Sequence, residues 1–252
     1  MSAGGRISST SGLPRKAMIL AAGLGTRLGQ LGESAPKCMM PVAGRPLLEH
    51  TVAWLRRYGV DDLVINLHHL PGVVVSHFGD GSRWGVRITY SLEPRLLGTA
   101  GGVRRVARLF DGPFFVWYGD NLSRCRLDRL HALHQARGGQ GTIALHYREN
   151  PTACGIVGLD ENDRITRFVE KPRREELFSH WASAGIFILE PVVLEAIPPD
   201  GAPDFGRHLF PALLAQGAAI YGYAMSESEG LWWVDTPEDL RRTQEAMAPG
   251  SS

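Results

Sequence analysis

Short apolar runs alternate with stretches of helical spacing through the first half of the chain. Each run is bounded by polar residues or glycine, which is typical of a buried strand, and the intervening stretches place apolar residues on one helical face. The predicted strands cover residues 17–22, 63–67, 86–90, 114–117 and 141–147, and the predicted helices cover residues 47–58, 71–78, 99–110 and 127–137. This alternation predicts an α/β fold with a mostly parallel sheet and helices on both faces.

After Gly155 the pattern becomes richer in strands. Two apolar runs flank the turn residues 160–163, which indicates a hairpin. Thr236 before Pro237, with Glu238 and Asp239 in the first turn, predicts the start of a closing helix. The predicted strands cover residues 155–159, 164–170, 182–189 and 218–224, and the predicted helices cover residues 191–197, 205–216 and 237–247. A smaller β-rich lobe therefore follows the α/β part.

Composition narrows the class of protein. The chain has 252 residues, 44% of them hydrophobic, and its 27 basic and 26 acidic residues leave a net charge of +1. This balance argues against a broad nucleic-acid or membrane surface, and no apolar stretch is long enough to span a membrane. The three cysteines lack metal-ligand spacing, which favours free thiols in a reducing cytoplasm. We expect disordered tails at residues 1–15, which lack a signal-peptide pattern, and at residues 248–252.

The first predicted strand leads into a loop suited to phosphates. Gly23 and Gly25 let backbone N–H groups approach a ligand closely, and Arg27 offers a planar fork of donors. Lys37 adds a second cation. Two commoner glycine loops are excluded, because the chain has no Gly-x-x-x-x-Gly-Lys-Ser/Thr string, and Leu28 stands where a dinucleotide fingerprint needs its third glycine.

The longer motif is specific to one family. Residues 20–28 read Leu-Ala-Ala-Gly-Leu-Gly-Thr-Arg-Leu, Pro36-Lys37 follows, and residues 41–47 read Pro-Val-Ala-Gly-Arg-Pro-Leu. This sequence resembles the sugar-1-phosphate nucleotidyltransferases over roughly residues 16–245. The resemblance implies the nucleotide-diphospho-sugar transferase fold in one domain, residues 16–247. Within it, residues 16–150 mainly bind the nucleotide, residues 151–235 mainly bind the sugar phosphate, and residues 236–247 form a closing helix.

The resemblance also implies roles for single residues. Arg27, Lys37, Asp120 and Lys171 correspond to catalytic positions. Glu93 would lie near the nucleobase, where a carboxylate accepts from the donors of guanine, which favours GTP. The implied nucleotide-binding residues are Leu20, Ala21, Ala22, Gly23, Gly25, Thr26, Glu93, Gly98, Thr99 and Ala100.

Two acids correspond to the metal ligands of the family. Asp120 follows the apolar strand 114–117, and Asp235 follows Trp232-Trp233-Val234. Either acid alone would more often cap a helix, but two distant carboxylates suit Mg²⁺, which takes its remaining ligands from phosphates and water. The family commonly has Asp-Ile-Gly-Thr-Pro, whereas this chain reads Asp235-Thr236-Pro237, two residues shorter.

The implied sugar site lies in the β-rich part. Glu170-Lys171-Pro172 matches the family's Glu-Lys-Pro motif, whose lysine contacts the sugar phosphate and whose glutamate accepts from sugar hydroxyls. Gly155 matches a glycine that lines the sugar pocket. Ser183 stands where the family usually has asparagine, and its side chain is shorter.

The expected reaction joins an NTP and a sugar 1-phosphate, with a mannose- or heptose-type sugar favoured, and no nucleic-acid or membrane partner. A homo-oligomer is compatible with the sequence. Two alternatives stay open. One is a glycosyltransferase of the related fold, which would need an Asp-x-Asp-like motif that the chain does not display. The other is a non-catalytic regulatory member, although such chains tend to lose the Arg, Lys or Asp residues that are present here.

Overall fold

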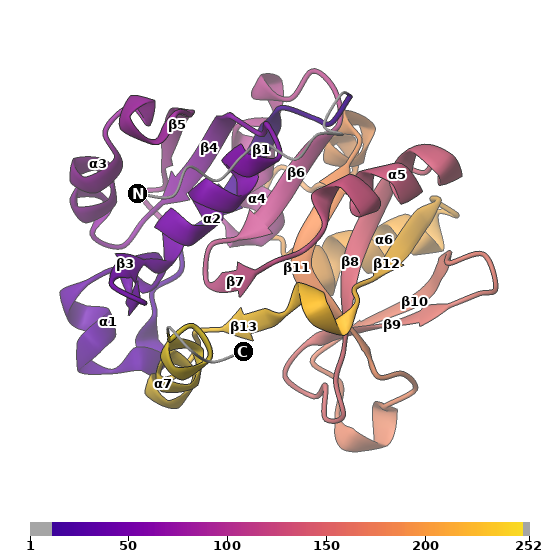
Figure 1. The fold of residues 1–252 in the computed structure, drawn as a ribbon. Coiled ribbons are helices and arrows are strands. Elements are labelled where there is room, and N and C mark those ends of the chain that lie inside the picture. The colour runs from indigo at the N-terminus through magenta and orange to yellow at the C-terminus, as the bar shows by residue number, and fades with distance from the viewer. Residues whose placement is uncertain (1–11, 249–252) are drawn as a thin grey trace. The chain divides into compact units, whose positions relative to one another are not determined.

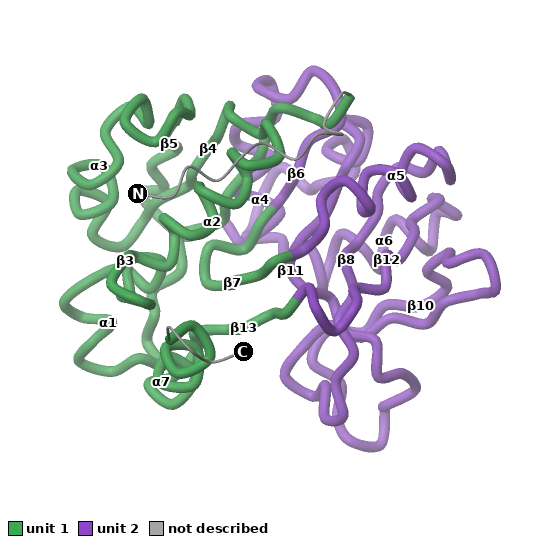
Figure 2. The backbone as a smooth tube through the Cα atoms, viewed as in Figure 1, with its two compact units in different colours: residues 1–96, 117–124, 230–252 green, residues 97–116, 125–229 purple. Residues whose placement is uncertain are grey.

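The computed structural model describes residues 12–248, which form two compact units (Figure 2). The first unit comprises the described residues up to Leu96, residues 117–124, and those from Gly230 onward. The second unit comprises residues 97–116 and 125–229. Most of the tail expected at residues 1–15, and nearly all of that at 248–252, lies outside the described residues.

Three parallel strands organise the first unit. They are β1 (Lys16–Leu20), β4 (Asp62–Leu67) and β5 (Arg87–Leu92), with Lys16 opposite Asp62 and Asp62 opposite Arg87. The interior of β1 and most of β4 are buried, as expected from their apolar sequences. Because the strands run in the same direction, the segments that follow Leu20, Leu67 and Leu92 leave from the same edge.

Short helices and ribbons complete this unit (Figure 1). The helices are α1 (Gln30–Ser34), α2 (Leu47–Arg57), α3 (Pro71–Phe78) and α7 (Pro237–Ala246). The ribbons pair β2 (Pro41–Val42) with β3 (Arg45–Pro46), and β7 (Asn121–Ser123) with β13 (Leu231–Trp233). A buried cluster including Leu28, Val42, Leu122, Val234 and Leu240 packs these distant segments together.

The second unit contains a mixed set of strands. They are β8 (Gly141–Tyr147), β9 (Gly155–Leu159), β10 (Ile165–Glu170), β11 (Trp181–Leu189) and β12 (Ile220–Ala224). β8 is antiparallel to β11 and parallel to β12, and β9 is antiparallel to β10 and β11. Strand β6 (Phe114–Tyr118) starts in this unit and ends in the first, since the division falls between Val116 and Trp117.

Helices and an aromatic cluster support the strands of the second unit. The helices are α4 (Gly98–Arg105), α5 (Leu127–Arg137) and α6 (Phe210–Ala215). Four phenylalanines pack ring against ring, with centroids 5.1–5.5 Å apart: Phe168, Phe187, Phe205 and Phe210. Phe168 belongs to β10 and precedes Glu170 by two residues.

Most predicted elements are confirmed, with local corrections. The helix predicted over 99–110 ends as an α-helix at Arg105, and a 3₁₀ turn follows over residues 107–109. Residues 191–196 form a 3₁₀ helix. The helix predicted over 205–216 starts with π-type turns at Phe205–Leu209 and continues as an α-helix from Phe210. The α/β class and the strand-rich second part are confirmed.

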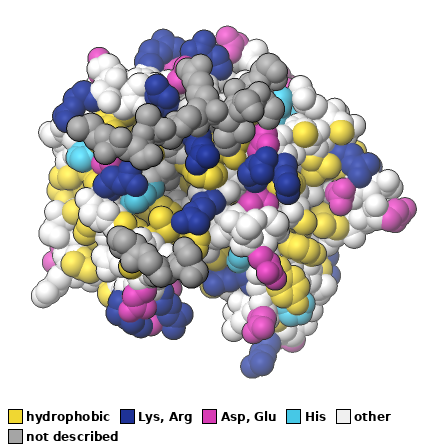
Figure 3. Space-filling model, in the orientation of Figure 1, with side chains coloured by type: hydrophobic (Ala, Val, Ile, Leu, Met, Phe, Trp, Pro, Cys, Tyr) yellow, Lys and Arg dark blue, Asp and Glu magenta, His cyan; other side chains and the backbone are white. Residues whose placement is uncertain are grey.

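The two units differ in extent from the functional parts expected from sequence, because each unit is assembled from separated segments. The assignment of those parts to nucleotide and sugar phosphate stays a prediction. Cys38, Cys125 and Cys154, all described, form no disulfide. Within residues 12–248, no helix is long and apolar enough to cross a membrane. Both signs of charge are interspersed over the face shown in Figure 3, and on α7 they adjoin where Arg241 pairs with Glu238 and Glu245.

Candidate active site

The loop after β1 is shaped by its glycines. Gly25 has a φ of +66°, a left-handed conformation, and precedes a 3₁₀ turn over Thr26–Leu28 that carries Arg27. Gly32 of α1 packs against this turn so closely that a Cβ there would lie 2.4 Å from the carbonyl oxygen of Gly25. The loop is therefore compact, and the Arg27 side chain projects from it with 60% exposure.

Two acids from distant segments meet at this loop. Asp120 lies between β6 and β7, and Asp235 lies between β13 and α7. Antiparallel pairing of Asn121 with Trp233, continued by a 3.1 Å hydrogen bond from the Val234 N–H to the Asp120 carbonyl, places the two residues side by side. Strands β7 and β13 have only three residues each, too few for a recognisable pattern. Their pairing, which brings the two acids together, could therefore not be predicted from the sequence.

Lys37 joins the two acids. Its Nζ donates to Asp120 Oδ2 at 2.5 Å and also to Asp235 Oδ1, and Arg27 Nη2 lies 2.9 Å from the same Asp235 oxygen. Desolvation of the Lys37 ammonium, whose side chain is only 12% exposed, opposes its charge, but the two carboxylates outweigh it and the pKa of Lys37 is raised. We call Arg27, Lys37, Asp120 and Asp235 the charged cluster.

The charged cluster has the donor set expected for a divalent cation. Oxygens of Asp120 and Asp235 converge on one cationic atom, Lys37 Nζ. Among the described residues, no group of three or more His, Cys, Asp or Glu side chains could hold a metal ion. Two carboxylates fit Mg²⁺ when phosphates and water complete its octahedral shell, whereas they would be too few for a closed protein site.

A second group of predicted residues lies at the same edge of the parallel strands. The Ala21 N–H donates to Asn66 Oδ1 at 2.9 Å, and Asn66 Nδ2 donates to Glu93 Oε1 at 2.8 Å. Asn66 and Glu93 are 3% and 4% exposed. The sequence analysis missed Asn66, although an asparagine inside the apolar run Leu-Val-Ile-Asn-Leu is itself a signal of a polar side chain with a specific partner.

The predicted nucleotide residues Gly98, Thr99 and Ala100 belong to the second unit and start α4. Thr99 Oγ1 donates to Asp204 Oδ1 at 3.1 Å and accepts from the Phe205 N–H at 2.9 Å. Gly98 has a φ of +74°, and a Cβ there would lie 2.5 Å from the Ala202 carbonyl oxygen. The start of α4 is thereby fixed to residues 202–205.

The predicted sugar residues gather around one carboxylate of the second unit. A Cβ on Gly155 would lie 2.6 Å from Glu170 Oε2, and a Cβ on Gly206 would lie 2.2 Å from the same atom. Burial raises the pKa of Glu170, although Lys171 and Arg207 act in the opposite direction. We call Glu170, Gly155 and Gly206 the Glu170 group. The sequence analysis assigned no site role to Gly206, and a glycine opening a helical segment was its only signal.

Lys171 and Ser183 lie between Glu170 and Gly206 in the sequence. Lys171 has a φ of +50°, which is unusual for a residue with a side chain, and its N–H donates to the Cys154 carbonyl at 3.0 Å. Ser183 Oγ accepts from the Gly185 N–H at 3.3 Å. Strained backbone next to Glu170 is consistent with a constrained binding residue.

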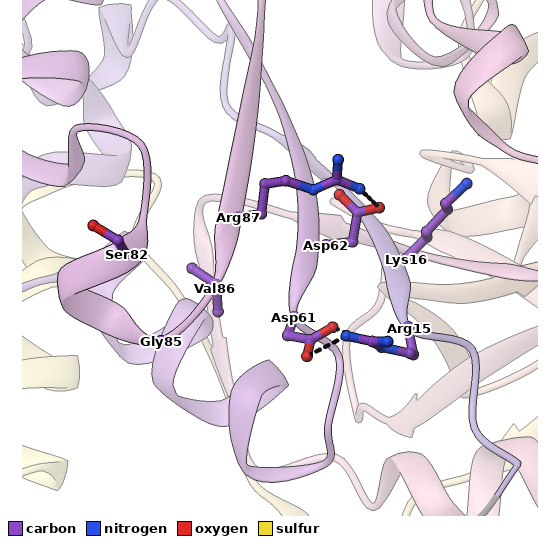
Figure 4. A pocket seen from close by; sticks show the side chains of 8 residues that line it. All are labelled: Arg15, Lys16, Asp61, Asp62, Ser82, Gly85, Val86 and Arg87. Carbon is purple, nitrogen blue, oxygen red and sulfur yellow. Dashed lines mark hydrogen bonds and ion pairs between the residues drawn. The ribbon is translucent and has the colours of Figure 1, made fainter.

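A surface pocket of the first unit does not involve the predicted residues. Figure 4 shows its lining side chains at the starts of β1, β4 and β5, where Arg15 pairs with Asp61 at 2.8 Å and Arg87 with Asp62 at 2.6 Å. Arg27 of the charged cluster follows the opposite end of β1, and Asn66 lies one residue before the opposite end of β4. The pocket is therefore separate from the candidate site.

Comparisons with known proteins show the family to which the chain belongs. The family model described as "Nucleotidyl transferase" matches residues 16–247. The chain is 37% identical over 234 residues to a UTP–glucose-1-phosphate uridylyltransferase of Synechocystis sp., covering 87% of this chain and 59% of that protein. It is also 37% identical over 238 residues to a mannose-1-phosphate guanylyltransferase of Mycobacterium tuberculosis, covering 93% of this chain and 65% of that protein.

Solved structures share the fold. The crystal structure of a UDP-glucose pyrophosphorylase complexed with UDP-glucose aligns with a TM-score of 0.79 at 20% identity, covering 92% of this chain and 97% of that chain. The chain spans less than two thirds of the length of the Synechocystis and M. tuberculosis relatives.

Proposed function

We propose, since this chain belongs to the nucleotidyl transferase family, that it transfers a nucleotidyl group from an NTP to a sugar 1-phosphate. The products are an NDP-sugar and pyrophosphate. The observation that carries the proposal is the charged cluster, because two phosphate-binding cations and two metal-type carboxylates from four separate segments meet at the glycine loop.

The chemistry requires charge neutralisation more than proton transfer. An anionic oxygen of the sugar phosphate attacks the α-phosphorus, a new P–O bond forms, and the bond to the β-phosphate oxygen breaks with its electron pair. The nucleophile is already ionised at neutral pH, so no general base is needed. Catalysis is then mainly positioning and stabilisation of the charge that develops on the departing pyrophosphate.

Each residue of the charged cluster has a role in this proposal. Arg27 holds triphosphate oxygens through its forked donors, and Lys37 neutralises the phosphates beside the reacting centre. Asp120 and Asp235 would hold Mg²⁺, which supplies charge neutralisation to the phosphates when bound. The role of Asp235 is supported by its position. Although the segment after it is shortened, its carboxylate accepts a hydrogen bond from the same Lys37 ammonium as Asp120 does.

The Glu170 group supports a sugar phosphate in the second unit. The two glycines let the Glu170 carboxylate pack where a Cβ would otherwise lie, and its oxygens could accept from sugar hydroxyls. Lys171 follows directly and would bind the phosphate. The presence of Lys171 together with the charged cluster also favours a catalytic chain over a regulatory one, because regulatory members tend to lose such residues.

GTP with a mannose- or heptose-type sugar is the favoured substrate pair. The M. tuberculosis relative is a mannose-1-phosphate guanylyltransferase, and it matches 93% of this chain. The second candidate is UTP with glucose 1-phosphate, because the Synechocystis relative bears that name at equal identity. A glycosyltransferase activity has less support, since the two acids come from distant segments rather than from one Asp-x-Asp-like motif.

The deciding experiment tests five NTPs against mannose, heptose and glucose 1-phosphates in the presence of Mg²⁺. Pyrophosphate release is measured for each pair. We expect turnover with one dominant pair and none without the sugar phosphate. Asp62→Asn serves as the matched control for site variants, because Asp62 pairs with Arg87 at the opposite ends of the strands. Release of free nucleoside diphosphate from an NDP-sugar, with transfer to an acceptor, would instead indicate a glycosyltransferase.

A further inference from the structure

Asn66 forms a buried bridge across the parallel strands. It is the penultimate residue of β4, in register with Leu20 of β1 and Ser91 of β5. Its Oδ1 accepts from the Ala21 N–H and its Nδ2 donates to Glu93 Oε1. The orientation of the amide follows from Ala21, because its N–H can only donate, so the amide oxygen of Asn66 faces it and the amide nitrogen donates to Glu93.

The bridge holds the point where the glycine loop leaves β1. Ala21 is the first residue beyond the strand, and its N–H has Asn66 as its partner. The preceding Leu20 carbonyl accepts from the Gly119 N–H at 2.9 Å. A Cβ on Gly119 would lie 2.9 Å from that Leu20 oxygen, so only glycine fits there without a shift. The start of the loop is therefore held from both sides.

These contacts form a continuous line along the carboxyl-end edge. Glu93 contacts Asn66, Asn66 contacts Ala21, the adjoining Leu20 contacts Gly119, and Gly119 is bonded to Asp120 of the charged cluster. Glu93 is itself fixed, because His68 Nδ1 lies 2.7 Å from its carbonyl oxygen and its N–H donates to the Leu67 carbonyl at 2.8 Å. A shift of Asn66 would therefore move the glycine loop relative to Asp120.

We propose that Asn66 is a positioning residue that, held by Glu93, sets the glycine loop for the triphosphate. Ala21 then contributes to nucleotide binding through the placement of its backbone, since its N–H is already used. Glu93 acts on Asn66, rather than on the nucleobase. The proposal rests on the proposed function for its link to the triphosphate, whereas the bridge itself is a property of the free chain.

The test uses three variants of the full chain: Asn66→Asp, Glu93→Gln and the double variant. Asn66→Asp replaces the amide that donates to Glu93 Oε1 with an acceptor, so two acidic side chains face each other in a buried site. In the double variant the new amide at position 93 can donate to the new carboxylate at position 66, which restores one donor and one acceptor. Glu93→Gln alone keeps an acceptor for Asn66. Asn162→Asp, at an exposed turn, is the control for the same chemical change.

We expect Asn66→Asp to disrupt the bridge and the double variant to restore it, as seen in two independent readouts. Hydrogen exchange at the Ala21 amide is slow in the wild type, fast in Asn66→Asp, and slow again in Glu93→Gln and in the double variant. With the substrates that the test of NTPs against sugar 1-phosphates identifies, Asn66→Asp raises the KM for NTP by about tenfold or more. The double variant brings this KM most of the way back to the wild-type value. The KM for sugar 1-phosphate does not change in any variant.

Several results would overturn the proposal. If Asn66→Asp keeps the wild-type exchange rate of the Ala21 amide and the wild-type KM for NTP, the bridge is not needed. If adding Glu93→Gln to Asn66→Asp rescues neither property, the two side chains do not act together. If Asn66→Asp does not fold, the double variant must still fold with a protected Ala21 amide. Loss of NTP discrimination in Glu93→Gln, with that amide still protected, would place Glu93 on the base instead.

The exchange readout separates this proposal from the proposed function. It needs no substrate, so a failure to find any turnover leaves the test of the bridge intact. Conversely, turnover with an unprotected Ala21 amide in the wild type would leave the proposed function standing and remove the bridge.

Discussion

In the first unit the carboxylates of Asp120 and Asp235 face cations of the same chain, whereas in the second unit the Glu170 carboxylate faces two glycines. The acids of the charged cluster are satisfied before any ligand arrives. Glu170 is instead partly desolvated, which raises its pKa, and its carboxylate packs closely against the backbone of two glycines. The first arrangement suits a site that exchanges one cation for another, and the second suits a site that receives neutral hydroxyls.

The largest effect is expected from Asp120→Asn, which keeps the size of the side chain and removes its charge. Loss of a metal-type carboxylate at the phosphates should lower kcat by roughly 10³-fold or more. Pyrophosphate release at saturating Mg²⁺ measures this, with circular dichroism and thermal unfolding to check the fold. Near-normal turnover, with Asp62→Asn also normal, would remove Asp120 from the mechanism.

Arg27→Lys should have the next largest effect, because a lysine cannot reproduce the forked donors of arginine. A charge-assisted bond that strengthens in the transition state contributes about 2–4 kcal/mol, or about 30- to 1000-fold in rate. We expect kcat to fall more than the KM for NTP rises. Steady-state kinetics decide, since an unchanged kcat with a raised KM would mean that Arg27 binds only the ground state.

Gly206→Ala tests the other side of the comparison. Its Cβ would lie 2.2 Å from Glu170 Oε2, so the carboxylate must move while the fold is kept. We expect the KM for sugar 1-phosphate to rise about fivefold or more, with the KM for NTP unchanged. Gly112→Ala is the control, because no atom lies within 4 Å of the added Cβ. An effect on NTP alone would contradict a sugar role for the Glu170 group.

A smaller effect should follow from the raised pKa of Glu170. Because the folded state binds the Glu170 proton more tightly than the unfolded state, this residue's contribution to stability falls as the pH rises through the ordinary pKa of 4.5 and levels off above the raised value. Glu170→Gln should therefore have a higher Tm than the wild type at neutral pH, and the difference should disappear in acid. Glu161→Gln, in the exposed turn, should show neither change.

The sequence predicted local features better than long-range ones. The bounds of α3, α5 and β8 agree with the predicted ranges, because a proline, a clear apolar face or glycine boundaries define them within the element itself. α1 and β7 were missed, since segments of three to five residues contain too little periodicity. The grouping of Lys37 with Asp120 and Asp235 depends on a strand pairing between residues about 110 positions apart, which no local pattern indicates.

The pairing of β7 with β13 also has a consequence for synthesis of the chain. Asp235, Val234 and Leu240 all belong to the last segment of the first unit, which follows some hundred residues of the second. During translation Lys37 and Asp120 emerge long before Asp235, so the nascent first unit lacks both a carboxylate and part of its apolar core. The charged cluster can therefore form only after Asp235 has been synthesised, and a chain stopped after Glu229 should bind neither NTP nor Mn²⁺ at this position.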